Sequence, residues 1–151
     1  MTLVYSHILV AVDGSKEAEW AFKKAAGIAK RNQAVLNIAY IVDNRSFGAI
    51  EAYDKTSAQK ANVYGNELVA GYKKEAMESG VPEVNGIVEY GVPKTLIPGE
   101  LAEKHQVDLI ICGASGLNAT ERFLMGSVSE RIVRTANCDV LVVRTPETDE
   151  A

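Results

Sequence analysis

The sequence contains little of what a cysteine metal site or a membrane segment would need. Its two cysteines, Cys112 and Cys138, match no metal-ligand spacing and adjoin strongly apolar segments, so we expect buried thiols and assign them no chemistry. Nowhere do about 18 apolar residues run together, and Met1 to Ser6 lack a basic region followed by a long apolar stretch. These absences predict a cytoplasmic protein with no membrane partner.

The chain also lacks any concentration of positive charge. Twenty acidic residues oppose sixteen Lys and Arg, which gives a formal charge of -4, and no run of Lys or Arg occurs. A protein that follows a phosphate backbone needs a basic face, so we expect no nucleic-acid partner. A small anionic ligand remains compatible with this composition, because a few backbone N–H groups can hold phosphate without net positive charge on the protein.

What the chain does contain is enough apolar material for one core. Its 151 residues are 47% hydrophobic and 24% charged, which suits one compact domain and is too short for two ordinary ones. We therefore expect a single domain over residues 1–151, with a frayed polar tail from about residue 145 to residue 151.

Short apolar runs, several of them nearly continuous, recur along the chain and are typical of strands that are covered on both faces. We predict five strands: His7 to Val12, Ala34 to Val42, Val84 to Glu89, Val107 to Cys112 and Val140 to Val143. Helical patterns lie between most of these runs. Because strands that alternate with helices are joined by right-handed crossovers, we expect one α/β domain with a parallel sheet.

The expected helices have recognisable boundaries. Ser15 is the predicted N-cap of the first helix, and further helices are predicted from about Ser57 to Ser79, around Leu96 to Ala102 and from Ser127 to Thr135. Pro98 and Gly99 interrupt the third of these. Because proline removes an amide and clashes with the preceding turn, that helix either kinks there or begins near Pro98.

A glycine-rich segment connects the fourth predicted strand to the last helix. It reads Gly113-Ala114-Ser115-Gly116, then nine residues, then Gly126-Ser127. Glycine lets backbone amides approach phosphate oxygens, and a helix N-terminus offers unpaired N–H groups, so the segment has the composition of a phosphate cradle. Turn geometry explains the same glycines equally well. The spacing is neither that of a P-loop nor that of a dinucleotide fingerprint.

The segment also resembles a known family. The pattern Gly113-x2-Gly116-x9-Gly126-Ser127, its continuation through Glu130 and the closing stretch from Asn137 to Arg144 look like the ATP-binding type of universal stress protein. The resemblance extends to the first strand, which ends Val10-Ala11-Val12-Asp13-Gly14-Ser15, and so covers nearly the whole chain. The family has one domain of about this length.

The resemblance implies a specific fold. It is an open, parallel, five-stranded sheet in the order 3-2-1-4-5 with helices on both faces, the adenine nucleotide alpha hydrolase-like arrangement. The strand order reverses between strands one and four, where open α/β sheets place ligands. Asp13 to Ser15 and Gly113 to Gly116 end those two strands, so the resemblance and the sequence pattern indicate the same edge of the sheet.

The resemblance also implies the residues of an ATP site. By this resemblance, Asp13 contacts the ligand on its ribose and adenine side, and the backbone at Val42 contacts adenine. The ribose and phosphates lie against Gly113, Gly116, Gly126, Ser127 and Val128. A divalent Mg²⁺ or Mn²⁺ would be held mainly by the phosphates. Alternatively, Asp13 caps the first helix and Val42 is an ordinary core residue. Between the glycines, Arg122 either reaches a phosphate or, as we prefer, projects into water.

These expectations favour a nucleotide-dependent sensor or regulator of the stress response. No catalytic residue stands out in the sequence. The first alternative function is a slow ATPase or phosphotransferase, and the second is an interaction scaffold that binds no ligand. The last strand, Val140 to Val143, is apolar and lies at the sheet edge in the implied order, which predicts a homodimer paired through that strand. The alternative is a monomer in which Arg144 and the acidic tail shield the edge.

Overall fold

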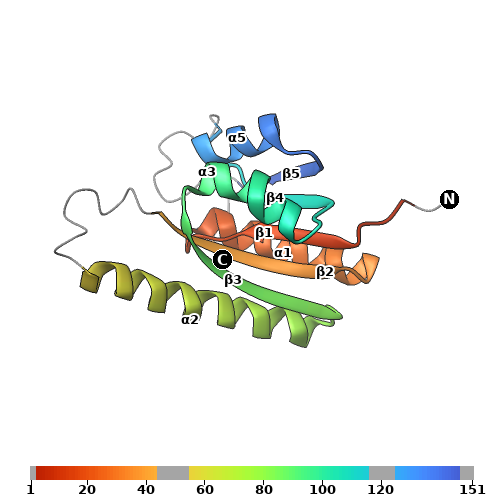
Figure 1. Ribbon diagram of the computed structural model, residues 1–151. Coiled ribbons are helices and arrows are strands. Elements are labelled where there is room, and N and C mark those ends of the chain that lie inside the picture. The colour runs from red at the N-terminus through yellow and green to blue at the C-terminus, as the bar shows by residue number, and fades with distance from the viewer. Residues whose placement is uncertain (1–2, 44–54, 116–124, 147–151) are drawn as a thin grey trace.

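The chain forms an α/β fold around a parallel sheet, shown by a computed structural model that describes residues 3–43, 55–115 and 125–146. The predicted strand order, β3-β2-β1-β4-β5, is confirmed, with every pairing parallel. The strands are β1 (His7–Ala11), β2 (Val35–Asp43), β3 (Glu83–Gly91), β4 (Leu109–Gly113) and β5 (Asp139–Val143). β1 is therefore the centre of the sheet and β5 one of its edges (Figure 1).

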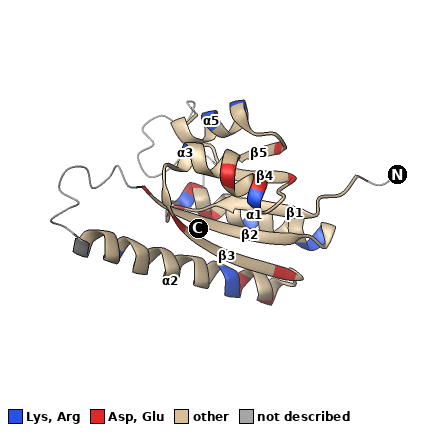
Figure 2. Cartoon of the chain, in the orientation of Figure 1, with Lys and Arg blue, Asp and Glu red and all other residues tan. Residues whose placement is uncertain are grey.

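Helices cover both faces of this sheet. α1 (Lys16–Asn32) and α2 (Lys55–Ser79) lie on one face, and the other carries α3 (Pro93–Leu96), the π-helical turn η3 (Ile97–Leu101), α4 (Ala102–Lys104) and α5 (Ser127–Thr135) (Figure 1). Within the described residues, no helix is long and apolar enough to cross a bilayer. In the view of Figure 2, blue basic segments and red acidic segments are scattered over several elements, and the visible blue segments do not gather on one element.

The continuous apolar character of β1 follows from its burial on both sides. Ile8 and Val10 pack with α1 and α2 in one core, whereas Leu9 packs with η3 and α5 in the other, and all three side chains are fully buried. Successive side chains of a strand point to opposite faces, so a strand that is covered on both faces is apolar at successive positions.

Several predicted boundaries differ from the structure by one or two residues, and local contacts explain the start of β4 and the course of the chain at Pro98. β4 begins at Leu109 instead of Val107, because the Val107 N–H still donates to the Ala102 carbonyl at the end of the preceding helix. The helical stretch begins at Pro93 and continues through Pro98, so the alternative that it begins near Pro98 is wrong. It passes this residue as the wider turn η3, which accommodates a residue that has no N–H to donate.

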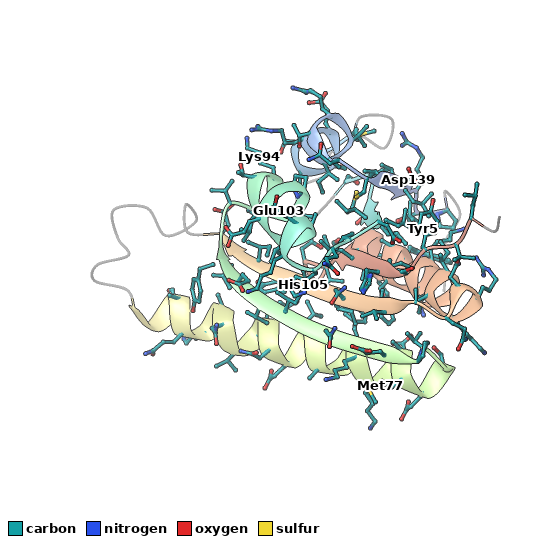
Figure 3. The ribbon with its side chains drawn as sticks, turned by 45° about the vertical axis from the view of Figure 1, so that its right-hand side comes forward. Tyr5, Met77, Lys94, Glu103, His105 and Asp139 are labelled. Carbon is teal, nitrogen blue, oxygen red and sulfur yellow. The ribbon has the colours of Figure 1, made fainter. Side chains whose placement is uncertain are left out.

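The amino ends of the strands are joined by side-chain hydrogen bonds. The two Asp108 carboxylate oxygens accept from the backbone N–H of Ser6 (2.8 Å) and of His7 (3.0 Å), which ties the start of β1 to the start of β4. The Tyr5 hydroxyl donates to Asp139 at 2.7 Å, and Figure 3 shows these two residues side by side. This polar end lies opposite the carboxyl ends, where the predicted site residues lie.

One polar side chain is fully enclosed in the sheet. Asn37 on β2 donates to the Ile8 carbonyl (3.2 Å) and accepts from the Asn85 side-chain amide on β3 (3.1 Å), and it is 1% exposed. The pair thus connects three adjacent strands. Because a buried polar group is costly without a partner, this connection favours one alignment of the strands.

We predict that Asn37→Ala lowers the free energy of unfolding by about 1–3 kcal/mol, because it leaves the Asn85 amide without its acceptor in a partly buried position. Chemical denaturation measures the effect. Asn66→Ala is the matched control, since the Asn66 side chain bonds only within the exposed surface of α2. Equal stability of the two variants would contradict the structural role of Asn37.

Candidate functional site

A cavity of about 500 Å³ opens at the carboxyl ends of the strands. Its walls come from the ends of β1, β2 and β4 and from the starts of α3 and α5, and they include Ala11, Asp13, Tyr40, Pro93, Gly113 and Ser127. β1 pairs with β2 on one side and β4 on the other, so the cavity lies where the strand order reverses. This is the location predicted for a ligand in an open parallel sheet.

Asp13 lies at the cavity, directly after β1. Its Oδ1 accepts from the backbone N–H of Ser15 at 2.9 Å, which closes a tight turn through Gly14 (φ +88°). Ser15 is the N-cap of α1, as predicted, because its hydroxyl accepts from the Ala18 N–H at 3.1 Å. The capping role considered for Asp13 therefore belongs to Ser15, and the Asp13 carboxylate shapes the turn at the cavity wall.

Gly113 lines the cavity and is also a packing position. A Cβ added there would lie 3.1 Å from both the Cβ and the carbonyl oxygen of Glu17 on α1. Such contacts are too close for a backbone that cannot move, so glycine at this position lets α1 approach the end of β4. The sequence pattern predicts that Gly113 contacts a ligand. The structure shows that this glycine also makes room for the close packing of α1 on the end of β4.

The two described ends of the glycine-rich segment are held together by hydrogen bonds. The Gly126 N–H donates to the Ala114 carbonyl (2.8 Å), and the Ser129 hydroxyl donates to the same carbonyl (2.8 Å). Ser129 is 3% exposed, and its role was not predicted. The sequence signal that could have indicated this role is a serine three residues after the glycine that precedes the last predicted helix. Gly116, a predicted site residue, and Arg122 lie outside the described residues.

The start of α5 directs unpaired backbone donors to the cavity. Gly126 is the N-cap and has no side chain to accept from the first turn, and Ser127 and Val128 both line the cavity. The first N–H groups of a helix have no acceptor within it, and they carry partial positive charge. This part of the site can therefore bind an anion such as phosphate.

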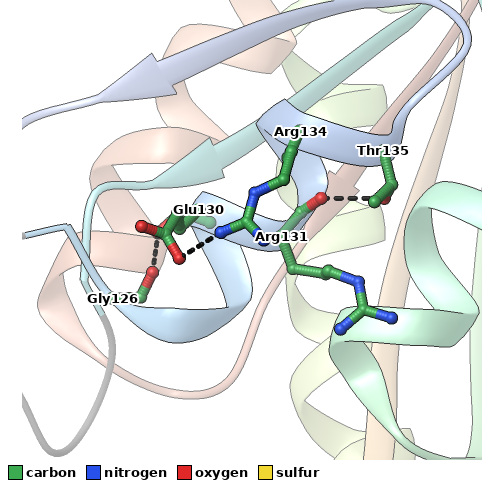
Figure 4. A network of polar contacts seen from close by, with 6 residues as sticks. Gly126, Glu130, Arg131, Arg134 and Thr135 are labelled. Carbon is green, nitrogen blue, oxygen red and sulfur yellow. Dashed lines mark hydrogen bonds and ion pairs between the residues drawn. The ribbon is translucent and has the colours of Figure 1, made fainter.

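The charged side chains that line the cavity are acidic. Asp13 and Asp43 are the charged residues among the described part of its wall, and no Lys or Arg is found there. On α5, Arg134 pairs with Glu130 at 2.7 Å along the helix (Figure 4). The cavity thus has amide donors at the α5 side and carboxylate acceptors at the β1 and β2 side. Such polarity suits a ligand with an anionic end and a hydroxyl- or amine-bearing end.

The thiol and phenol in the cavity wall stay protonated at neutral pH. Cys112 is 4% exposed, which confirms the predicted burial of this thiol, and burial raises its pKa to about 12. Cys138 is half-buried, and burial again raises its pKa. The pKa of Tyr40 is raised, first by burial and then by the neighbouring Tyr64 and Asp13.

Val42 lies beside the cavity and its side chain is in the core. It is 2% exposed, and its two neighbours on β2, Ile41 and Asp43, line the cavity. The structure thus brings together Asp13, Gly113, Gly126, Ser127 and Val128 of the predicted residues, and it places Val42 next to them. Tyr40 and Asp43 are additional wall residues that sequence patterns did not indicate, because β2 reads as an ordinary apolar strand.

Comparisons with known proteins agree with this fold. The family model described as "Universal stress protein family" matches residues 5–144. A protein of Staphylococcus haemolyticus named as a universal stress protein is 54% identical over 148 residues, which is 98% of this chain and 90% of the relative. The solved universal stress protein UspA from Lactobacillus plantarum is 31% identical with a TM-score of 0.87, and the match covers 95% of this chain and 100% of that one.

A further solved structure has a bound ligand in its description. It is a universal stress protein in complex with cAMP, 24% identical to this chain, with a TM-score of 0.71 and coverage of 95% of this chain and 100% of that one. At this identity the similarity shows the shared fold.

We predict that Ser129→Ala lowers the free energy of unfolding by about 1 kcal/mol, because it removes the buried hydroxyl that donates to the Ala114 carbonyl. Thermal and urea unfolding measure this change. The control is Ser127→Ala, two residues earlier, where the side chain is exposed and the stability should stay within about 0.5 kcal/mol of wild type. A Ser129 variant as stable as that control would show that this hydroxyl does not close the segment.

Proposed function

The chain belongs to the universal stress protein family, which supports a role in the stress response, and we propose that it binds ATP and acts as a nucleotide-dependent sensor or regulator of that response. The observation that carries the proposal is the polarity of the cavity. Uncapped amides of α5 lie at one side of it and the Asp13 carboxylate lies at the other. A nucleoside triphosphate has the matching polarity, with phosphates at one end and ribose hydroxyls and an amino group at the other.

Each predicted residue has a role in this proposal. The backbones of Gly113 and Gly126 and the start of α5 at Ser127 and Val128 hold the phosphates, and the Asp13 carboxylate accepts from the nucleoside. The size of the cavity, about 500 Å³, lies within the range of small-molecule sites. From the family pattern we add Gly116 to the phosphate contacts and the backbone at Val42 to the adenine contacts.

The divalent cation of the proposal, Mg²⁺ or Mn²⁺, is held mainly by the phosphates themselves. In the described parts of the chain, no group of three or more His, Cys, Asp and Glu side chains is arranged to hold a metal.

The alternative functions use the same fold. A slow ATPase or phosphotransferase needs a group that positions water, and in this proposal the Asp13 carboxylate is a contact for the nucleoside instead. A scaffold that binds no ligand would use only the outer surface of the fold to contact partner proteins. Mass spectrometry of gently denatured protein separates the three classes, because co-purified ATP indicates a sensor, ADP a hydrolase and no nucleotide a scaffold.

We expect the α5 amide to matter more than the Ser127 hydroxyl. Ser127→Ala removes the hydroxyl alone and should weaken ATP binding severalfold, and Ser127→Pro also removes the N–H and should weaken it by about a further tenfold. Proline fits here because the preceding Gly126 is extended (ψ 160°) and the first N–H is outside the helical ladder. Calorimetry with Mg-ATP measures both variants. If both variants fold and bind Mg-ATP with wild-type affinity, the proposal that the start of α5 binds the phosphates is wrong.

We also propose a homodimer paired through β5. Its inner edge pairs with β4, and no described strand pairs with its outer edge. The Val143 carbonyl accepts from the Ala114 N–H on the β4 side, so the backbone groups of Val142 face the open edge. An unpaired apolar edge strand is a template for a second copy about a two-fold axis.

Light scattering at micromolar concentration should therefore give twice the 16.3 kDa of one chain. Val142→Pro removes an outward amide and should increase the dissociation constant of the dimer, while the pairing of β5 with β4 is kept. Glu83→Pro, at the first residue of the opposite edge strand β3, is the control and should leave the mass unchanged. A wild-type mass near 16.3 kDa would exclude this dimer.

A further inference from the structure

Tyr64 of α2 reaches the turn that carries Asp13. A Cβ added to Gly14 would overlap the Tyr64 hydroxyl, so the phenol lies directly against the backbone of this turn. Gly14 has φ +88°, and its neighbours are the cavity residue Asp13 and the helix cap Ser15. A side chain from a distant helix thus covers the outer side of the turn at the cavity wall.

The same tyrosine holds a second part of the wall. The Tyr64 and Tyr40 rings meet edge to face, with centroids 5.9 Å apart and an interplanar angle of 69°. Tyr40 lines the cavity, and its ring packs so closely on α2 that a Cβ at Gly65 would overlap it. The Tyr40 ring therefore packs on α2, Tyr40 also borders the cavity, and Tyr64 is the α2 side chain at the edge of this ring.

Two separate observations thus place Tyr64 behind the nucleoside side of the cavity. One is its contact with the turn that follows β1, and the other is its contact with a residue of β2. Tyr64 is 48% exposed, which is high for a residue that serves the core alone. The raised pKa of Tyr40, caused first by burial and then by Tyr64 and Asp13, agrees with the close grouping of these three side chains.

We propose that Tyr64 is a positioning residue for the nucleoside end of the ligand, which it serves by holding the Tyr40 ring and the Asp13 turn in place. This inference rests on the proposed ATP binding and deepens it. The phosphate end, at the start of α5, is built from other elements. Loss of Tyr64 should therefore weaken contacts with the base and sugar and leave the phosphate contacts unchanged.

The experiment compares three probes, ATP, adenosine and inorganic tripolyphosphate, by calorimetry on the full chain. Tyr64→Ala should weaken ATP and adenosine binding by about the same factor, roughly tenfold, and should leave tripolyphosphate binding unchanged. Tyr64→Phe keeps the ring against Tyr40 and should recover most of this loss. Tyr90→Ala is the matched control, since Tyr90 on β3 is 47% exposed and is not among the residues lining the cavity.

A second measurement tests the contact without any ligand. Gly14→Ala forces a methyl group onto the Tyr64 hydroxyl and should destabilise the protein, in part through the positive φ and in part through this overlap. In the double variant Gly14→Ala/Tyr64→Ala the overlap is gone. Its loss of stability should therefore be smaller than the sum of the two single losses.

The outcomes separate this proposal from the one on which it rests. If wild-type protein does not bind ATP, both are overturned. If wild type binds ATP and Tyr64→Ala binds it as tightly as Tyr90→Ala does, the role of Tyr64 alone is overturned. Equal weakening of ATP and tripolyphosphate would also overturn it, because that result indicates a general loosening. Should Tyr64→Ala fail to fold, Tyr64→Leu is judged by the same criteria.

Discussion

The parallel pairing of β1 with β4 is the constraint on which the rest of the structure depends. It aligns Ile8 with Leu109 and Val10 with Ile111, two segments that lie about a hundred positions apart in the chain. Asp108 strengthens this alignment by accepting from the N–H groups at the start of β1. Because both strands run in the same direction, the turn after β1 and the glycine-rich segment after β4 emerge at the same edge of the sheet.

Everything at the cavity follows from that alignment. α1 leaves from the turn after β1 and α5 from the segment after β4, so the crossovers diverge to opposite faces and leave a space between them. Gly113 allows α1 to pack closely on the end of β4, and Ser129 joins the two described ends of the glycine-rich segment. The cavity is thus a consequence of how the strands pair, and the loops refine it.

Binding of an anion through backbone amides suits an acidic protein. With a net charge of -4 and carboxylates in the cavity wall, the long-range field of the chain does not attract a polyanion, and attraction must come from short-range donors. The amides of α5 act over about one turn of helix, so they attract a ligand only at short range.

The sequence by itself determined the five strands, the order implied by the family pattern and five of the residues that line the cavity, namely Asp13, Gly113, Gly126, Ser127 and Val128. A continuous apolar run indicates a strand that is buried on both faces, and a glycine directly before a helix indicates an N-terminus without a side-chain cap. Both signals lie in contiguous residues, so the sequence alone carries them. It did not determine that Ser129 closes the segment, that Gly113 is needed by α1, or that Tyr40 and Tyr64 stand behind the cavity. Those relations join residues far apart in the chain, and only the packing of α1 and α2 on the sheet brings them together.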